Sequence, residues 1–134
     1  MVLPEPSVSG AISPADRCFA LATIKRGGRA DAPSTISVKQ ILVRYSGALE
    51  AGADITRTRA DACLRAEEAR KKLAGGADFD DVAKTYSDDK RDLGSITRAK
   101  VAPQFADAAF ELEPGYVSYV VETDAGFHVI MRTD

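Results

Sequence analysis

Strand-like and helix-like apolar patterns follow one another along this chain in an order that favours one class of fold. Residues 38–45 are predicted to form the first strand, because apolar side chains recur there at every second position. Residues 93–96 add a short strand, and residues 117–121 and 127–132 are two further strands joined by a turn at 124–126. With helices between them, the order β-α-α-β-α-β-β predicts an α+β fold, in which helices cover a small four-stranded sheet, antiparallel or mixed.

The helices between the strands are predicted from their capping residues and apolar stripes. Thr58, with Asp61 three residues later, is a capping pair that starts the first helix, and the glycines at 75 and 76 end it. Asp78 caps the second helix, and Pro103 marks the start of the third. The apolar stripes of the second and third helices comprise Phe79, Val82, Ala83, Tyr86, Phe105, Ala108, Ala109 and Leu112.

Residues 1–36 differ in composition from the rest and are predicted to be a flexible extension or linker before a domain at 37–134. The prolines, serines and glycine at positions 4–10 are typical of a disordered lead-in. Ser13 before Pro14, with Asp16 in the first turn, indicates a short helix at 14–26. Its apolar residues would let this helix dock on the domain. The alternative is a linker to another domain, with only transient helix.

Composition and charge exclude several classes of function. The 134 residues suffice for one domain, and a net charge of −2 offers no broad basic surface to nucleic acid or an anionic membrane. No apolar run is long enough to span a bilayer and no signal segment is recognised, so we expect an intracellular protein, cytoplasmic or nuclear, and a monomer. Cys18 and Cys63 have neither metal-ligand spacing nor a disulfide framework pattern, which favours buried or incidental reduced thiols.

A set of ordered segments in the last hundred residues carries a family resemblance. They are VKQILV at 38–43, DLG at 92–94, FADAAF at 105–110, EPG at 113–115 and TDAGFHVI at 123–130. In order and spacing they resemble the parvulin family of peptidyl-prolyl cis/trans isomerases, nearest its Pin-type branch. The resemblance implies the parvulin fold, with an extra short helical turn before the second strand. It also implies catalysis on the X-Pro bonds of proteins, without a cofactor or a covalent intermediate.

Rotation of a prolyl bond calls for an apolar pocket beside a few polar groups. The rotation breaks amide resonance against a barrier of roughly 18–20 kcal/mol. The twisted amide carries less charge on its oxygen, so its removal from water favours the transition state over the planar ground state. The resemblance places the proline pocket at Leu93, Val101 and Phe105. Val101 is shorter than the family's methionine and would widen the pocket, and the alternative is that Leu93 and Phe105 are ordinary core residues.

The polar network implied by the resemblance departs from the family at one position. His128, the only histidine, matches the second of two family histidines and is expected to fix hydrogen bonds rather than shuttle protons. Gln40 stands at the first histidine position and cannot carry a charge, so the rate would be reduced or lost. Thr123 matches a hydrogen-bonding threonine. Asp89 matches a family aspartate, whose carboxylate would accept a hydrogen bond from His128 or lie over the substrate carbonyl. The alternative is that Asp89 is an ordinary solvated acid in a loop.

The loop that recognises phosphate in the Pin-type branch lacks the necessary charge in this chain. Residues 55–60 and Arg44 resemble that branch, but residues 46–54 contain acids and no arginine. We therefore expect little or no preference for phosphorylated serine or threonine before proline. Two functions remain open: a prolyl isomerase acting on protein substrates, and a non-catalytic proline-peptide-binding module of a larger multidomain protein. Turnover of a proline peptide distinguishes them.

Overall fold

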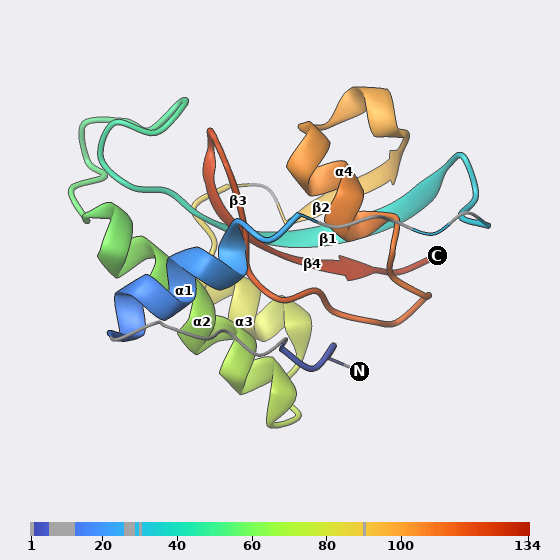
Figure 1. Ribbon diagram of the computed structural model, residues 1–134, viewed down its shortest axis with the longest axis horizontal. Helices are drawn as coiled ribbons and strands as arrows, with labels where there is room; N and C mark the ends of the chain where they lie inside the picture. The colour runs from blue at the N-terminus through green and yellow to red at the C-terminus, as the bar shows by residue number, and fades with distance from the viewer. Residues whose placement is uncertain (1, 6–12, 26–28, 30, 90) are drawn as a thin grey trace.

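The computed structural model describes residues 2–5, 13–25, 29, 31–89 and 91–134, and its centre is a four-stranded antiparallel sheet (Figure 1). Strand β1 (Ile36–Val43) pairs with β2 (Asp92–Ile96) on one side and with β4 (Gly126–Arg132) on the other, and β3 (Val121–Thr123) forms the far edge. The order β2-β1-β4-β3 confirms the α+β prediction, and each pair of neighbouring strands in the sheet is antiparallel.

Helices cover both faces of the sheet (Figure 1). On one face, α2 (Arg59–Ala74) and α3 (Phe79–Tyr86) share a core with the side chains of Ile41 and Val43. On the other face, α4 (Pro103–Ala109) shares a second core with alternate residues of the same strands. The period-two alternation of β1 therefore supplies one side-chain set to each layer.

Local capping sets the helix starts where the sequence predicts them. The Thr58 hydroxyl accepts from the Asp61 amide at 3.1 Å, and the Asp78 carboxylate accepts from the Asp81 amide at 3.2 Å. The extra helical turn differs from expectation, because in the described residues it follows β2, as the 3₁₀ helix η1 (Arg98–Lys100), and does not precede it.

The strand predicted at 117–121 is wrong over most of its length. Regular pairing starts only at Val121, and Val117 makes an isolated bridge to Met131. The Ser118 hydroxyl accepts the amide hydrogen of Ile130 at 3.0 Å, in the place where a continuous ladder would use a backbone carbonyl. This side-chain bond replaces one backbone bond of the ladder, and regular pairing of β3 begins further along the chain, at Val121.

The N-terminal helix α1 (Pro14–Ala22) is docked on α2 and linked to it covalently. Cys18 and Cys63, predicted to be reduced thiols, form a disulfide across the two helices. Spacing gave no sign of this pair, because it depends on how α1 packs against α2. The Phe19 ring also stacks on Phe127, with centroids 6.3 Å apart. The helix predicted at 14–26 ends earlier, at Ala22, where Thr23 is the C-cap residue. The predicted lead-in at 4–10 lies largely outside the described residues, and the boundary at 36/37 stays a prediction.

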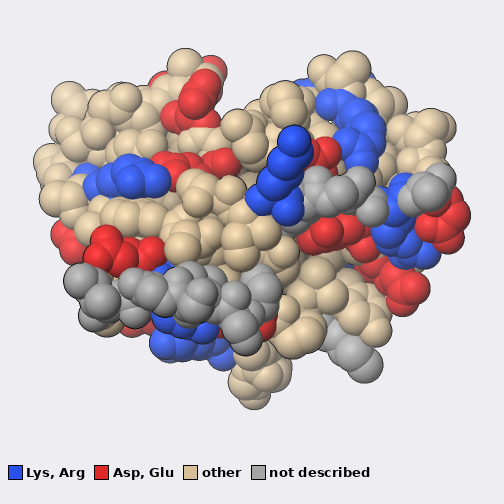
Figure 2. All heavy atoms as spheres, in the orientation of Figure 1, with Lys and Arg blue, Asp and Glu red and all other residues tan. Residues whose placement is uncertain are grey.

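Charged side chains of both signs are interspersed on the face shown in Figure 2, with no single broad basic patch. This agrees with the small net charge of the chain. Within the described ranges, no helix is both long enough and apolar enough to cross a membrane.

Candidate active site

Every residue that the sequence analysis assigned to the site lines one pocket, of about 210 Å³, between the central strands and the start of α4. These residues are Gln40, Asp89, Leu93, Val101, Phe105, Thr123 and His128. The structure thus brings together side chains from segments far apart in the sequence. Their roles in catalysis stay predictions.

Sheet register explains why Gln40 and His128 lie close together. Residue 128 of β4 pairs with Leu42 of β1, and Gln40 lies two positions before Leu42 on the same face. Thr123 and His128 flank the short turn between β3 and β4, where Val121 pairs with His128. The antiparallel ladder therefore builds this part of the site from three neighbouring strands.

The imidazole of His128 has hydrogen-bond partners on both ring nitrogens. Nδ1 lies 2.8 Å from Oε1 of Gln40, and Nε2 lies 2.7 Å from Oγ1 of Thr123. Because an amide oxygen can only accept, Nδ1 carries the hydrogen, and Nε2 accepts from the Thr123 hydroxyl. That hydroxyl in turn accepts from the Ala125 amide at 3.2 Å. The result is a chain of neutral donors running from Ala125 to Gln40.

The surroundings of His128 keep its ring uncharged. The pKa of His128 is lowered to about 3, chiefly by burial and in addition by the nearby positive charge of Arg44, while the negative charge of Asp89 acts in the opposite direction. The neutral ring agrees with the hydrogen-bond directions above. It also agrees with the expectation that His128 orients a network and does not shuttle protons at neutral pH.

This neutral state predicts a directional effect of pH on stability. The folded-state pKa of about 3 lies below the ordinary 6.5, so between these values the unfolded chain binds more protons. The free energy of unfolding should fall as pH drops from about 6.5 toward 3, by up to about 1.4 kcal/mol per pH unit from this residue. Urea unfolding of wild type and His128→Gln at several pH values checks this. Parallel curves for the two proteins, or a His128 ring that titrates near pH 6.5 by NMR, would contradict it.

The apolar part of the pocket lies directly beside the imidazole. The Phe105 ring meets the His128 ring edge-on, with centroids 5.2 Å apart and planes at 83°. Phe105 is buried in the second core as well as lining the pocket, whereas Leu93 and Val101 are only partly buried and pack against that core. The core alternative therefore describes part of what Phe105 does, and the exposed parts of the partly buried Leu93 and Val101 leave apolar surface open to a ligand.

Two adjacent acids have different surroundings. The Asp89 carboxylate lines the pocket and accepts from Nη2 of Arg44 at 2.9 Å. Of the two roles left open for Asp89, a bond from His128 does not form, because both ring nitrogens bond elsewhere, and a position over the substrate carbonyl stays a prediction. Asp88, which the sequence analysis missed, accepts from the Arg44 amide at 2.9 Å and from Arg57 at 2.5 Å. Asp88 thus links the end of β1 to the last residues of the loop that leads to α2.

The sequence analysis also missed two pocket residues in the loop at 46–54. Leu49 and Glu50 line the pocket, and the Leu49 amide donates to the Asp124 carbonyl at 2.8 Å. Glu50 has a φ of 63°, a left-handed conformation that is uncommon outside glycine. Leu49 is 61% exposed. A large apolar side chain exposed beside a pocket is typical of a binding surface, and only the structure reveals this exposure.

Comparison with known proteins identifies the family of this chain. The model of the PPIC-type PPIASE domain matches residues 21–134. The chain is similar to the dodo protein of Drosophila melanogaster, with 37% identity over 115 residues, covering 78% of this chain and 69% of that protein. It is similar to Pin1 of Malus domestica, with 34% identity over 116 residues, covering 76% and 96% of the two chains. The structure of the peptidyl-prolyl isomerase ESS1 from Candida albicans matches with a TM-score of 0.68 and 26% identity, over 81% of this chain and 66% of that one.

Other relatives are much longer than this chain, which spans 42% of the foldase PrsA 1 of Bacillus cereus. The shared part is the domain that carries the pocket. The family match over most of the chain, together with the Pin1 and dodo similarities, confirms the resemblance seen in the sequence. The chain belongs to the PPIC-type, or parvulin, family of peptidyl-prolyl cis/trans isomerase domains.

Proposed function

We propose that this chain catalyses cis/trans isomerisation of X-Pro bonds in protein substrates, at the pocket beside His128. The observation that carries the proposal is the convergence of an apolar surface and a closed neutral hydrogen-bond network on one small cavity. Membership of the isomerase family supports the same activity.

In the proposed mechanism the proline ring occupies the apolar surface of Leu93, Val101 and Phe105, which removes the amide from water. The twisted amide loses less hydration than the planar amide on transfer, so the barrier falls. The network from Thr123 through His128 to Gln40 fixes the shape of the pocket, and no proton needs to leave any group. Gln40 supplies the acceptor for Nδ1 of His128, so both ring nitrogens have a partner without a second imidazole.

A blocked pocket tests this function. Val101→Glu would place a charge where the proline ring binds, and Val101→Met would restore the family's longer apolar side chain. We expect wild type and Val101→Met to accelerate exchange of an Ala-Ala-Pro-Phe peptide in NMR exchange spectra, and Val101→Glu to lose at least about tenfold of that rate. Binding without faster exchange in wild type would instead support the binding-module alternative, which the altered position at Gln40 favours.

We further propose that phosphate before proline gives no advantage. The guanidinium of Arg44, the basic residue at the pocket, donates to Asp89 at 2.9 Å and to the Asp88 carbonyl at 3.3 Å, and lies 3.9 Å from Glu50. Neighbouring acids thus offset its charge, and an added phosphate would meet their repulsion.

Peptides with phosphoserine, glutamate or alanine before proline measure this preference. We expect the phosphoserine peptide to have a kcat/KM no higher than that of the alanine peptide. The double variant Leu49→Arg/Glu50→Arg should raise the phosphoserine rate relative to alanine, because it supplies paired donors beside Arg44. A clear phosphoserine preference in the wild type would refute the proposal.

The cellular compartment is also a proposal. The sequence predicts an intracellular protein, whereas the Cys18–Cys63 disulfide favours an oxidising environment. Alkylation of the thiols in freshly lysed cells, followed by mass spectrometry, decides between them, since a reduced pair would support the intracellular expectation.

A further inference from the structure

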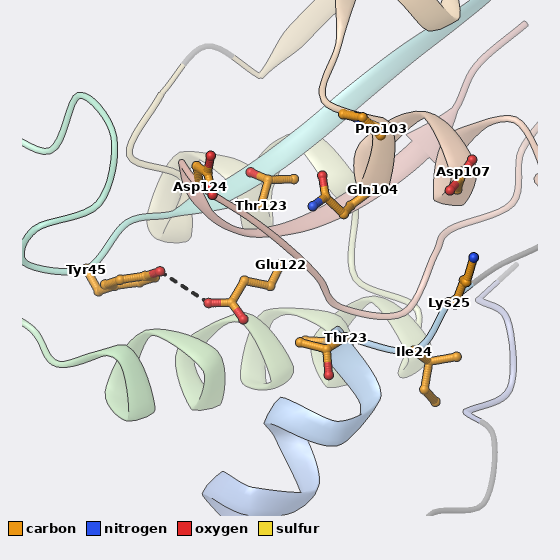
Figure 3. Close-up of a pocket in the computed structure, with 11 residues that line it drawn as sticks. Thr23, Ile24, Lys25, Tyr45, Pro103, Gln104, Asp107, Glu122, Thr123 and Asp124 are labelled. Atoms are coloured by element: carbon orange, nitrogen blue, oxygen red, sulfur yellow. Dashed lines mark hydrogen bonds between the residues drawn. The ribbon is translucent and has the colours of Figure 1, made fainter.

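A second pocket, of about 570 Å³, adjoins the candidate active site (Figure 3). The residues after α1 form one wall, the start of α4 forms another, and the end of β3 lies between them. The labelled lining residues are Thr23, Ile24, Lys25, Tyr45, Pro103, Gln104, Asp107, Glu122, Thr123 and Asp124.

The two pockets are neighbours along a shared rim. Thr123 lines both of them. On α4, Pro103 and Gln104 of the larger pocket lie between Ala102 and Phe105 of the smaller one. A peptide held by its proline in the smaller pocket would therefore pass over this rim into the larger one. At about 3.3–3.6 Å per extended residue, only a few residues are needed to cross it.

The polar groups of the larger pocket suit a peptide chain. Glu122 is engaged by Arg59 at 2.6 Å and Asp107 by Arg98 at 3.0 Å. Within the described part of the chain, the side chains of Lys25, Gln104 and Asp124 have no hydrogen-bond or ion-pair partner. They present an ammonium, an amide and a carboxylate, which together supply both donors and acceptors, as the main chain of a peptide requires.

The α1 wall is fixed to the domain. The Cys18–Cys63 disulfide holds α1 on α2, and the Arg59 guanidinium lies over the Phe19 ring at 4.0 Å. The Thr23 hydroxyl donates to the Phe19 carbonyl at 2.8 Å and closes the end of the helix. The wall is therefore a built part of the site, contributed by the segment before the first strand.

We propose that the larger pocket is a second subsite for the substrate chain and binds residues that flank the proline. The preferred substrate is then a peptide segment longer than a tetrapeptide, which extends from the proline pocket across the shared rim. This inference rests on the proposed isomerase function and adds to it a second binding surface and the length of peptide that the two pockets bind.

The test compares the tetrapeptide Ala-Ala-Pro-Phe with forms extended by about four residues at either end. We expect one of the extended peptides to bind several-fold more tightly and to shift the amide signals of Thr23, Ile24 and Lys25, which the tetrapeptide leaves in place. The extension carries either lysine or glutamate. Lys25→Glu should move the affinity ratio toward the lysine peptide by about two- to fivefold, the size of an exposed charge interaction. Lys72→Glu, the same charge change on the exposed end of α2, serves as the control and should leave the ratio unchanged.

The outcomes separate this inference from the proposed function. Equal affinity for short and extended peptides, with no shifts at 23–25, overturns the subsite even if the tetrapeptide is turned over. Shifts at 23–25 and a ratio changed only by Lys25→Glu support the subsite even if no peptide is turned over, in which case the isomerase proposal fails and the chain is a peptide-binding module.

Discussion

Replacing Cys18 and Cys63 together with alanine is expected to lower the free energy of unfolding by about 4 kcal/mol. The bridge joins residues 45 positions apart, and a closed loop of this length restricts the unfolded chain by roughly that amount in the chain-entropy model. Alanine keeps both buried positions apolar. The loss of stability therefore reflects the missing cross-link, without the added cost of burying a polar side chain.

Urea unfolding followed by circular dichroism measures the effect. Wild type in reductant should match the double variant, and reductant should leave the double variant unchanged. A double variant within about 1 kcal/mol of the oxidised wild type would show that the cross-link contributes little to the stability of the domain. That result would also remove the argument that the wall of the larger pocket is fixed.

Gly126→Ala is expected to destabilise the protein by at least about 3 kcal/mol and to abolish the site with it. A Cβ at this position would lie 2.4 Å from the Val43 carbonyl oxygen and 3.1 Å from the Arg44 Cα, and both are backbone atoms that cannot turn aside. The φ of 136° adds strain for any side chain. Because Gly126 starts β4 and His128 follows two residues later, separating β4 from β1 would also break the contact with Gln40.

Gly115→Ala is the matched control within the chain. Gly115 also has a positive φ, 85°, but a Cβ there would meet no atom within 4 Å. It should cost only the backbone strain, about 1–2 kcal/mol. The difference between the two variants in thermal or urea unfolding isolates the close approach of the strands. Similar losses for both would mean that backbone strain alone sets the need for glycine at 126.

The features that the sequence predicted well are those set by local chemistry. Alternation with period two gives β1 its two faces, and capping by Thr58 and Asp78 starts the helices where the structure has them. The family motifs placed the pocket residues, because motif spacing in this fold is tied to sheet register. Gln40 and His128 therefore lie as close together as the resemblance implied.

The features that it predicted poorly depend on contacts between distant segments. The disulfide requires α1 to dock, and nothing in the spacing of Cys18 and Cys63 encodes that docking. The short β3 reflects the hydroxyl of Ser118, which accepts from the Ile130 amide of β4 in place of a backbone carbonyl. Asp88 was missed because its bonds to the Arg44 amide and to Arg57 form only when two loops meet in the folded chain. In each case the outcome depends on a contact between segments far apart in the sequence, and local sequence patterns do not predict that contact.

The central claim is that prolyl isomerisation runs on a neutral network in which Gln40 replaces a histidine. NMR exchange rates of a proline peptide with catalytic amounts of wild type, His128→Ala and Gln40→His test it most directly. We predict exchange above the uncatalysed rate in wild type, none in folded His128→Ala, and a rate at least equal to wild type in Gln40→His. Exchange in His128→Ala as fast as in wild type would contradict the assigned site. Catalysis that appears only in Gln40→His would show that the glutamine has turned this isomerase fold into a binding module.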